Sequence, residues 1–324
     1  MKTITLEEHF VSPSFLEGPG KGLTEQAKNP QSYIGKIFEQ LRDLGDKRIA
    51  EMDAAGIDVQ VLSLNSPGME QLDPEAAKKI AKETNDFLAS AIKDHPQRFA
   101  GFAALPTADP KAAAIELERT VRDHDFKGAI INGHVKGRYL DNKMFWPIFE
   151  RAEALSVPIY LHPTQPPQSV IDASYSGFDP MVTNMLIGAG WGWHIETAIH
   201  VIRLILGGVF DQYPKLQIII GHMGETLPFM LQRLDRIMSP EITKLKHPIG
   251  AYLRENIFYT FSGFNYTSTF LDLLLEVGVD RIMFSVDYPY ASMAQGRDFL
   301  NKLPVSAADK ERIAHGNAEM LLKI

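Results

Sequence analysis

The chain has 324 residues and a globular composition, 45% hydrophobic and 23% charged, with no apolar run near the roughly 18 residues that span a bilayer. Its formal net charge of −7 and the lack of any basic run argue against nucleic acid as a partner. Because the chain has no cysteine, disulfides and a thiolate nucleophile are excluded, and any bound metal must be held by His, Asp or Glu. The opening MKTITLEEHF lacks the apolar region of a signal peptide, so we expect a cytoplasmic protein without a membrane partner.

Short apolar, β-branched runs alternate with longer amphipathic patterns along the chain. The predicted strands cover residues 3–10, 58–65, 99–106, 128–133, 157–163, 216–224, 256–263 and 281–289. The clearest helical patterns cover residues 74–95, 110–124, 144–155, 196–213 and 268–278. This alternation predicts an α/β fold, a (β/α)8 TIM barrel forming one domain over residues 1–324, with a small N-terminal cap insertion at about 11–45. The competing doubly wound sheet would need a glycine-rich phosphate fingerprint after the first strand, and none is present.

The first strand carries an unusual run of acids and a histidine. Side chains alternate along a strand, so Glu7 and His9 are expected on one face and Glu8 on the other. A carboxylate beside an imidazole is a common beginning of a metal site. The alternative from these residues alone is a solvent-facing terminal strand with incidental charges.

Three later strands also end in titratable residues, which is informative because the active site of a TIM barrel lies at the carboxyl ends of its strands. These residues are His162, His222 and Asp287. Together with Glu7 and His9 they offer nitrogen and oxygen ligands that suit Zn²⁺ or Mn²⁺ with open positions for substrate or water. Glu225 follows His222 by three residues and is expected to fix its tautomer, which favours a catalytic role for His222. The alternative for Glu225 is an acid at a helix start.

The remaining histidines are interpreted as packing or surface residues: His95, His124, His194, His200, His247 and His315. His134 follows the fourth strand and could reach the edge of the site. That strand, GAIINGH, offers no lysine to bridge two metals, so a single metal is expected. Trp191, Trp193 and Tyr288 are compatible with a pocket wall, a subunit contact or the core.

Several segments resemble the metal-dependent decarboxylase branch of the amidohydrolase superfamily, which includes γ-resorcylate, 2,3-dihydroxybenzoate, 5-carboxyvanillate and aminocarboxymuconate-semialdehyde decarboxylases. The segments are EEHF, RIAEMDAAGIDVQVLSLNSPG, RFAGFAALP, YLHP, ETAIHVIRLILGGVFDQYPKLQIIIGHMGE and DRIMFSVDYPY. The resemblance extends to the C-terminal GNAEMLLKI and weakens in the cap and in residues 164–193.

Carried over position by position, the resemblance implies that one divalent metal, Zn²⁺ or Mn²⁺, is surrounded by four side chains: Glu7, His9, His162 and Asp287. His222 and Glu225 match the family's histidine and its partner, and with Asp287 they form the expected catalytic set. Three weaker matches are expected to contact substrate: Arg48, Asn65 and Arg233. Arg233 would do so from a neighbouring subunit of a homodimer or homotetramer. The alternatives are packing or solvated arginines and a turn-forming asparagine.

The implied activity is non-oxidative decarboxylation of a hydroxybenzoate. Direct loss of CO₂ would leave an aryl carbanion orthogonal to the π-system, so the ring carbon must first be protonated, and Asp287 is the expected donor. The rival is a hydrolase such as a lactonase, in which the same metal activates water. Tyr290 and Ala291 stand where relatives of the resorcylate type carry Phe and Glu, which leaves room for a different choice of substrate.

Overall fold

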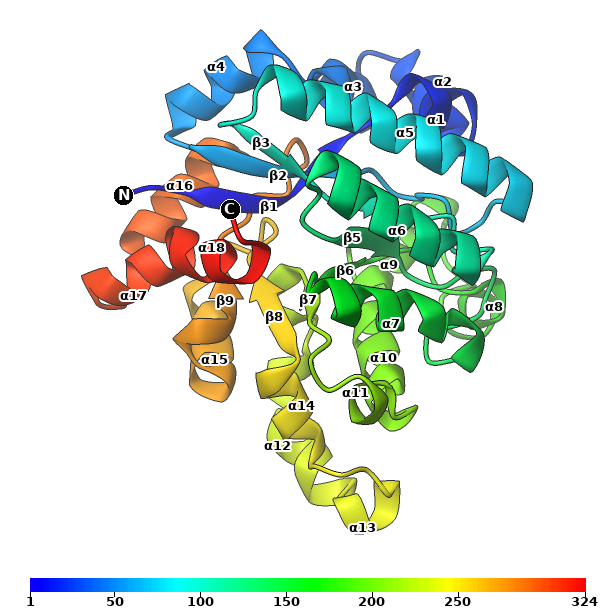
Figure 1. Ribbon diagram of the computed structural model, residues 1–324, viewed down its shortest axis with the longest axis vertical. Helices are drawn as coiled ribbons and strands as arrows, with labels where there is room; N and C mark the ends of the chain where they lie inside the picture. Colours follow the sequence, from blue (N-terminus) through cyan, green and yellow to red (C-terminus); the bar gives the residue numbers. More distant parts are fainter.

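Every strand runs parallel to its neighbours in the computed structural model, which describes residues 1–324. The strands are β1 (Ile4–Phe10), β2 (Val59–Leu64), β3 (Phe99–Gly101), β4 (Ala103–Ala104), β5 (Ala129–Asn132), β6 (Ile159–His162), β7 (Ile218–Ile220), β8 (Ile257–Thr260) and β9 (Ile282–Met283). The order is β1-β2-β3 and then β4 to β9 in sequence, and a bridge between Leu6 and Ser285 closes the ring (Figure 1). β3 and β4 are two parts of the third predicted strand, interrupted at Phe102. The predicted (β/α)8 barrel is confirmed.

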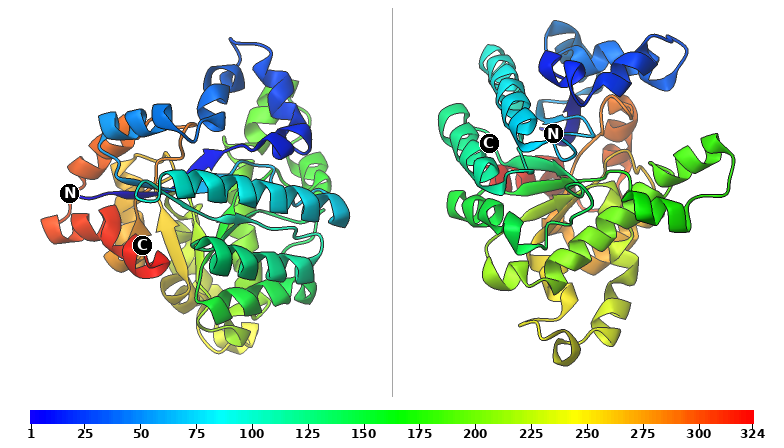
Figure 2. Two further views of the ribbon diagram at one scale, coloured as in Figure 1. Left: turned by 45° about the horizontal axis from the view of Figure 1, so that its top comes forward. Right: turned by 90° about the vertical axis from the view of Figure 1, so that its right-hand side faces the viewer.

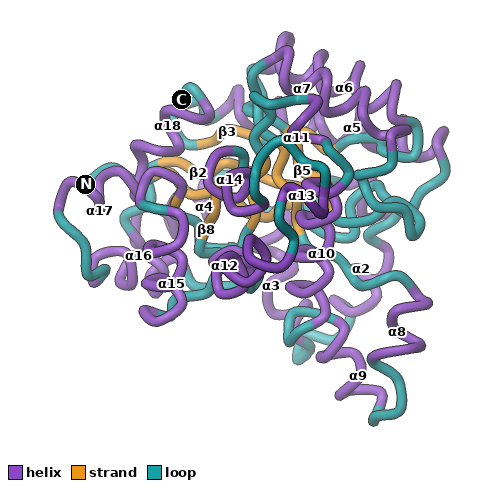
Figure 3. Tube along the Cα trace, turned by 90° about the horizontal axis from the view of Figure 1, so that it is seen from below, coloured by secondary structure: helices purple, strands orange, loops and turns teal.

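Helices surround the strands on the outside (Figures 2 and 3). The α-helices are α1 (Pro13–Glu17), α2 (Lys21–Ala27), α3 (Tyr33–Arg42), α4 (Asp46–Ala55), α5 (Pro74–Asp94), α6 (Pro110–His124), α7 (Trp146–Leu155), α8 (Gln168–Ser174), α9 (Pro180–Ile187), α10 (Gly192–Leu206), α11 (Val209–Gln212), α12 (Leu227–Ile237), α13 (Pro240–Thr243), α14 (Ile249–Glu255), α15 (Thr267–Val277), α16 (Met293–Lys302), α17 (Ala307–Glu311) and α18 (Asn317–Leu322). Short helical turns are η1 (Lys143–Phe145), η2 (His222–Gly224), η3 (Val279–Arg281) and η4 (Arg312–Gly316). None of these helices combines the length and apolarity that a membrane crossing needs.

Two hydrophobic cores hold the barrel together. The smaller one fills the inside with side chains from almost every strand, such as Leu6, Phe102 and Tyr160. Ala318 and Leu322 of α18 join this cluster, so the C-terminal helix closes the amino-terminal end of the barrel. The larger core of 62 buried residues lies between the strands and the helices and fixes the strand ends on which functional side chains sit.

The segment expected to be a cap contains α1, α2 and α3, which follow β1 directly. Tyr33 at the start of α3 donates a hydrogen bond to the carbonyl of Tyr290 at 2.9 Å, so this segment reaches the loop after β9. A second excursion, α8 and α9, extends away from the barrel (Figure 3). These two segments coincide with the regions where the family resemblance weakens.

Candidate active site

Glu7 points into the mouth of the barrel because β1 contains a bulge. Ile4 and Leu6 face the interior, and simple alternation would turn Glu7 outward. The register against β2 instead shifts between Thr5 and Glu8, and Glu7 adopts a left-handed backbone with φ of 62°. The inserted residue reverses the alternation, so Glu7 and His9 both reach the site. Left-handed backbone at a residue other than glycine costs free energy and is concentrated at functional sites.

One oxygen of the Glu7 carboxylate is held by hydroxyl groups and the other is free. Oε2 accepts hydrogen bonds from the hydroxyls of Tyr160 and Ser262. A Cβ atom at position 221 would lie 2.6 Å from this oxygen, so the glycine there leaves space for the carboxylate. Oε1 is buried without a hydrogen-bond partner. A buried carboxylate oxygen with no donor is the arrangement that a metal ligand requires.

His162, His9 and Asp287 complete the group around this oxygen. His162 donates from Nδ1 to the carbonyl of Pro163 at 2.8 Å, which leaves the Nε2 lone pair 3.3 Å from Glu7 Oε1. Nε2 of His9 lies 3.1 Å from Oδ1 of Asp287. Burial lowers the pKa of His9 to about 3, so its imidazole is neutral and can act as a ligand.

These residues fit a divalent cation. Donor atoms that share one ion at ~2.0–2.2 Å lie about 3.0–3.5 Å apart, which matches the two measured separations. Burial raises the pKa of Asp287 well above its usual value, and the carboxylate of Glu7 raises it further. A cation between the two carboxylates would remove this repulsion. Two imidazoles and two carboxylates are a ligand set suited to Zn²⁺ or Mn²⁺.

His222 lies beside this group and is held by Glu225. Its Nε2 lies 3.8 Å from Glu7 Oε1, and its Nδ1 donates to Glu225 Oε1 at 2.7 Å. Burial opposes the charged form of His222, but the carboxylates of Glu225 and Glu7 outweigh it and raise the pKa to about 10. The expected pairing of His222 with Glu225 is therefore present in the structure.

His194 also belongs to this cluster, which corrects its interpretation as an ordinary helix residue. Its Nδ1 lies 2.6 Å from the second oxygen of Glu225, and its ring lies 4.7 Å from that of His222. This contact is hard to predict from the sequence, because the two partners are 31 residues apart and His194 lies in an amphipathic helical pattern. The run WGWH at the start of α10, with its glycine and two aromatic residues, was the available signal.

Glu8 and Arg48 lie behind β1. The carboxylate of Glu8 accepts from the backbone N–H groups of Val286 at 2.9 Å and Tyr288 at 3.3 Å, on either side of Asp287. Arg48 is fully buried, donates to the carbonyl of His9 at 2.8 Å, and lies over the ring of Tyr288 at 4.6 Å. This placement corrects the expected substrate contact: Arg48 stabilises the strand from its outer side, and Tyr288 belongs to the core.

Asn65 is connected to the site through Tyr290. Its Oδ1 accepts a hydrogen bond from the hydroxyl of Tyr290 at 2.7 Å, and the ring of Tyr290 meets that of His9 edge-on at 5.5 Å. The rings of Trp193 and His162 are arranged edge-on with 6.2 Å between their centroids, so Trp193 lies beside the site. Arg233 is exposed on α12 and forms no ion pair, which places it outside this cluster within one chain.

The other histidines are occupied elsewhere. His134 accepts from the N–H of Gly137 at 2.9 Å and donates to the carbonyl of Gln165 at 3.1 Å, so both ring nitrogens are used locally. His200 is buried and accepts from the N–H of Leu140 at 2.9 Å.

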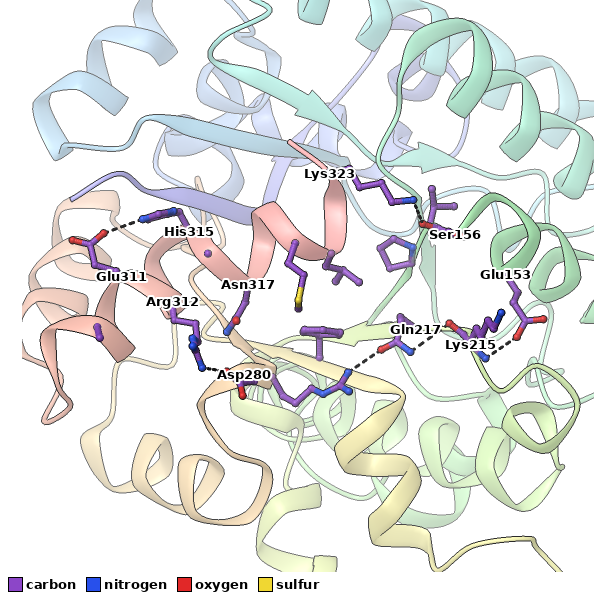
Figure 4. A pocket seen from close by; sticks show the side chains of 18 residues that line it. Glu153, Ser156, Lys215, Gln217, Asp280, Glu311, Arg312, His315, Asn317 and Lys323 are labelled. Atoms are coloured by element: carbon purple, nitrogen blue, oxygen red, sulfur yellow. Dashed lines mark hydrogen bonds and ion pairs between the residues drawn. The ribbon is translucent and has the colours of Figure 1, made fainter.

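A cavity of about 900 Å³ lies at the opposite, amino-terminal end of the barrel (Figure 4). Several of its charged groups are paired with one another. Arg312 contacts Asp280, and His315 lies 2.9 Å from Glu311. Because the unpartnered Oε1 of Glu7 lies at the other end, within 4 Å of imidazole nitrogens of His162 and His222, the candidate active site is the mouth around Glu7.

Comparison with known proteins agrees with this geometry. The family profile described as "Amidohydrolase" matches residues 36–324. The chain is 39% identical to γ-resorcylate decarboxylase of Polaromonas sp. strain JS666, over 99% of this chain and 98% of that protein. A crystal structure of 2,6-dihydroxybenzoate decarboxylase complexed with 2,6-dihydroxybenzoate superposes with a TM-score of 0.89 at 37% identity and covers 100% of both chains. 5-Carboxyvanillate decarboxylase of Novosphingobium aromaticivorans, complexed with manganese and 4-hydroxy-3-methoxy-5-nitrobenzoic acid, gives a TM-score of 0.91 at 36% identity, covering 100% of this chain and 96% of that one.

These similarities extend over the whole chain and include the barrel strands that carry the acids and imidazoles. The match therefore includes both the fold and the segments that form the mouth. This chain belongs to the amidohydrolase family, in the branch of metal-dependent decarboxylases.

Proposed function

We propose that this enzyme removes CO₂ from a benzoate that carries a hydroxyl ortho to its carboxylate, with 2,6-dihydroxybenzoate as the first candidate. The observation that carries the proposal is the meeting of Glu7, His9, His162 and Asp287 beside His222 in one mouth, where all but Asp287, whose side chain is 19% exposed, are buried. The full-length similarity to a γ-resorcylate decarboxylase, whose substrate is this same acid, supports the choice.

Asp287 is the proposed proton donor. Burial raises the pKa of its carboxyl, which favours the protonated form that a proton donor requires. The proton passes to the ring carbon that bears the carboxylate, while the ortho hydroxyl supplies electron density to the ring. The bond from this carbon to the carboxylate then breaks, CO₂ leaves, and the bonding electrons restore aromaticity.

A divalent cation held by Glu7, His9, His162 and Asp287 would stabilise the negative charge on the oxygens of the substrate. His222 is proposed to support the same charge, since its raised pKa keeps an N–H donor directed at the mouth. Trp193 and Tyr290 provide aromatic surfaces on either side of His162 and His9 against which a substrate ring can pack.

The proposal includes a homo-oligomer. Exposed apolar side chains on two helices support it: Phe229 on α12 is 79% exposed, and Met181 and Met185 on α9 are 70% and 57% exposed. Arg233 lies on α12 one turn after Phe229, so an assembly through this helix would place Arg233 in a subunit contact. Light scattering of the purified protein would measure the mass, and a monomer at micromolar concentration would contradict this part.

The activity is tested by incubating manganese-loaded enzyme with 2,6-dihydroxybenzoate in D₂O. We expect CO₂ and resorcinol with one deuterium at the carbon that carried the carboxylate. Asp287→Asn should lower kcat by about 10²- to 10⁴-fold, as expected for loss of a general acid. No CO₂ from any ortho-hydroxybenzoate, together with hydrolysis of a lactone, would refute the proposal, and normal decarboxylation by Asp287→Asn would refute the donor assignment.

A further inference from the structure

His194 is a histidine with no assigned role, and both of its ring nitrogens are engaged. Nδ1 lies 2.6 Å from Oε2 of Glu225, and Nε2 lies 3.0 Å from the carbonyl oxygen of Ala189. A carbonyl can only accept, so Nε2 carries a hydrogen, and Nδ1 donates to the carboxylate of Glu225 in the imidazolium form, which has a hydrogen on each nitrogen. The side chain is 10% exposed, and its ring meets that of Phe264 edge-on at 5.0 Å. His194 is therefore fixed in one orientation that directs Nδ1 at Glu225.

Glu225 lies between two imidazoles and bonds to each with a different oxygen. Oε1 accepts from His222 at 2.7 Å and Oε2 faces His194 at 2.6 Å. Both carboxylate oxygens are thus used, and neither can rotate away without losing a short contact. The chain of contacts runs from the carbonyl of Ala189 through His194 and Glu225 to His222, whose Nε2 faces Glu7 at 3.8 Å.

The backbone that carries His222 and Glu225 needs such an anchor. All five residues from 222 to 226 have positive φ angles, between 51° and 90°, and only Gly224 among them is a glycine. Left-handed backbone costs roughly 1–2 kcal/mol for each residue other than glycine, so this turn is strained unless its surroundings hold it. Within the turn, Gly224 donates to Gly221 at 2.8 Å, whereas the bond from Glu225 to His222 is 3.4 Å long. His194 adds a side-chain contact to Glu225 from outside the turn.

We propose that His194 is a positioning residue of the active site, which holds Glu225 against the left-handed turn so that His222 keeps its Nε2 directed at Glu7 and the substrate. The inference rests on the catalytic role proposed above for His222. His194 itself touches neither the substrate position nor the proposed metal ligands. It acts through the carboxylate of Glu225.

The alternative that the three side chains bind a second metal ion is not supported by their contacts. His194, His222 and Glu225 lie close enough to share an ion. However, each oxygen of Glu225 already accepts one imidazole N–H, and Nε2 of His194 is engaged by a carbonyl. A metal would have to displace these hydrogen bonds.

The test compares His194→Phe with His194→Asn in the metal-loaded enzyme. Phenylalanine keeps the ring packing against Phe264 and removes both nitrogens, whereas asparagine keeps an N–H donor near the position of Nδ1. We expect His194→Phe to lower kcat by about 10- to 100-fold, the usual effect of losing a residue that orients an active-site group. KM and metal content should stay close to wild type, and His194→Asn should recover most of kcat. A wild-type kcat in His194→Phe, or equal loss in both variants, would overturn the proposal.

A double-mutant cycle shows whether His194 acts through Glu225. In a Glu225→Gln background, His194→Phe should cause little further loss of kcat, because the contact it removes is already broken. The same loss in both backgrounds would contradict the proposal. A wild-type kcat in His222→Gln would refute the role of His222, whereas an inactive His222→Gln beside a fully active His194→Phe would refute only the positioning role.

Proton NMR of the zinc-loaded enzyme provides a readout that does not depend on turnover. The two short contacts to Glu225 should give two imidazole N–H resonances far downfield of the backbone amides. His194→Phe should remove one resonance and shift the other, since His222 loses its fixed partner. Removal of one resonance without a shift of the other would show that the two histidines are independent and would overturn the inference.

Discussion

Tyr160→Phe should weaken metal binding without disturbing the barrel. Tyr160 is fully buried in β6, and its hydroxyl donates to Oε2 of Glu7 and lies 2.7 Å from the hydroxyl of Thr260. Phenylalanine fills the same space and removes only the donor. A hydrogen bond to a charged group contributes about 1.5–3 kcal/mol, and Ser262 remains as the second donor. At about 1.4 kcal/mol for each factor of ten, the dissociation constant of the metal should rise about 10- to 100-fold.

The assay is isothermal titration calorimetry, in which Mn²⁺ or Zn²⁺ is added to metal-free protein and the dissociation constant of the metal is measured. Tyr259→Phe is the matched control, because Tyr259 is also buried in a barrel strand, β8, and its hydroxyl donates to the carbonyl of Leu253 at 2.7 Å. The control should lose about 0.5–1.5 kcal/mol of unfolding free energy and keep the wild-type metal affinity. Equal affinities of Tyr160→Phe and Tyr259→Phe would refute the assignment of Glu7 as a ligand supported by Tyr160.

Three further predictions concern stability and positioning. Removing the metal with a chelator should abolish activity and lower the unfolding temperature. Adding Mn²⁺ at a hundred times its dissociation constant should restore about 2.7 kcal/mol of unfolding free energy. The same unfolding temperature with and without metal would contradict a metal site that exists only in the folded state. Burial lowers the pKa of His200 to about 3, so between pH 6.5 and 3 the unfolded chain binds a proton that the folded chain does not. As the pH is lowered through this range, the unfolding free energy of the wild type should decrease by up to about 1.4 kcal/mol per pH unit. Urea melts at several pH values should show a smaller decrease for His200→Gln. Glu8→Gln places an amide group against the N–H of Val286 or Tyr288 and should lower kcat by about 10- to 100-fold at unchanged metal content, whereas an unchanged kcat would mean that Glu8 does not position Asp287.

The architecture could be predicted from the sequence because the signals were local. Runs such as LQIII and NIFYT are β-branched or aromatic and bounded by helical patterns, and each became a strand within a few residues of the predicted ends. The strand predicted over 216–224 is the informative exception. It ends at Ile220, and the residues after it form the left-handed turn. Nothing in His222, Met223 or Glu225 favours positive φ, since the conformation is imposed by tertiary contacts.

The candidate site was predictable to the extent that strand ends meet at one edge of a parallel barrel. That rule brings together the strand ends that carry Glu7, His9, His162 and Asp287, but it does not decide which side chains of a strand face the mouth. It says nothing about residues that approach from behind a strand or from another helix. Arg48 and His194 were therefore misinterpreted, because their partners lie far away in sequence and are chosen by packing.

Glu7 and His9 share one face of the first strand, as side-chain alternation predicts. They face the mouth of the barrel, however, only because the strand contains a bulge. Ile4 and Leu6 face the barrel interior, so an unbroken strand would direct Glu8 into the mouth and leave Glu7 and His9 outside. The bulge at Glu7 inserts one residue and reverses this assignment. Glu8 is then directed behind the strand, where its carboxylate holds the backbone on both sides of Asp287. One bulge thus places two proposed ligands, Glu7 and His9, in the mouth. It also directs Glu8 to the backbone around Asp287, near the other end of the chain.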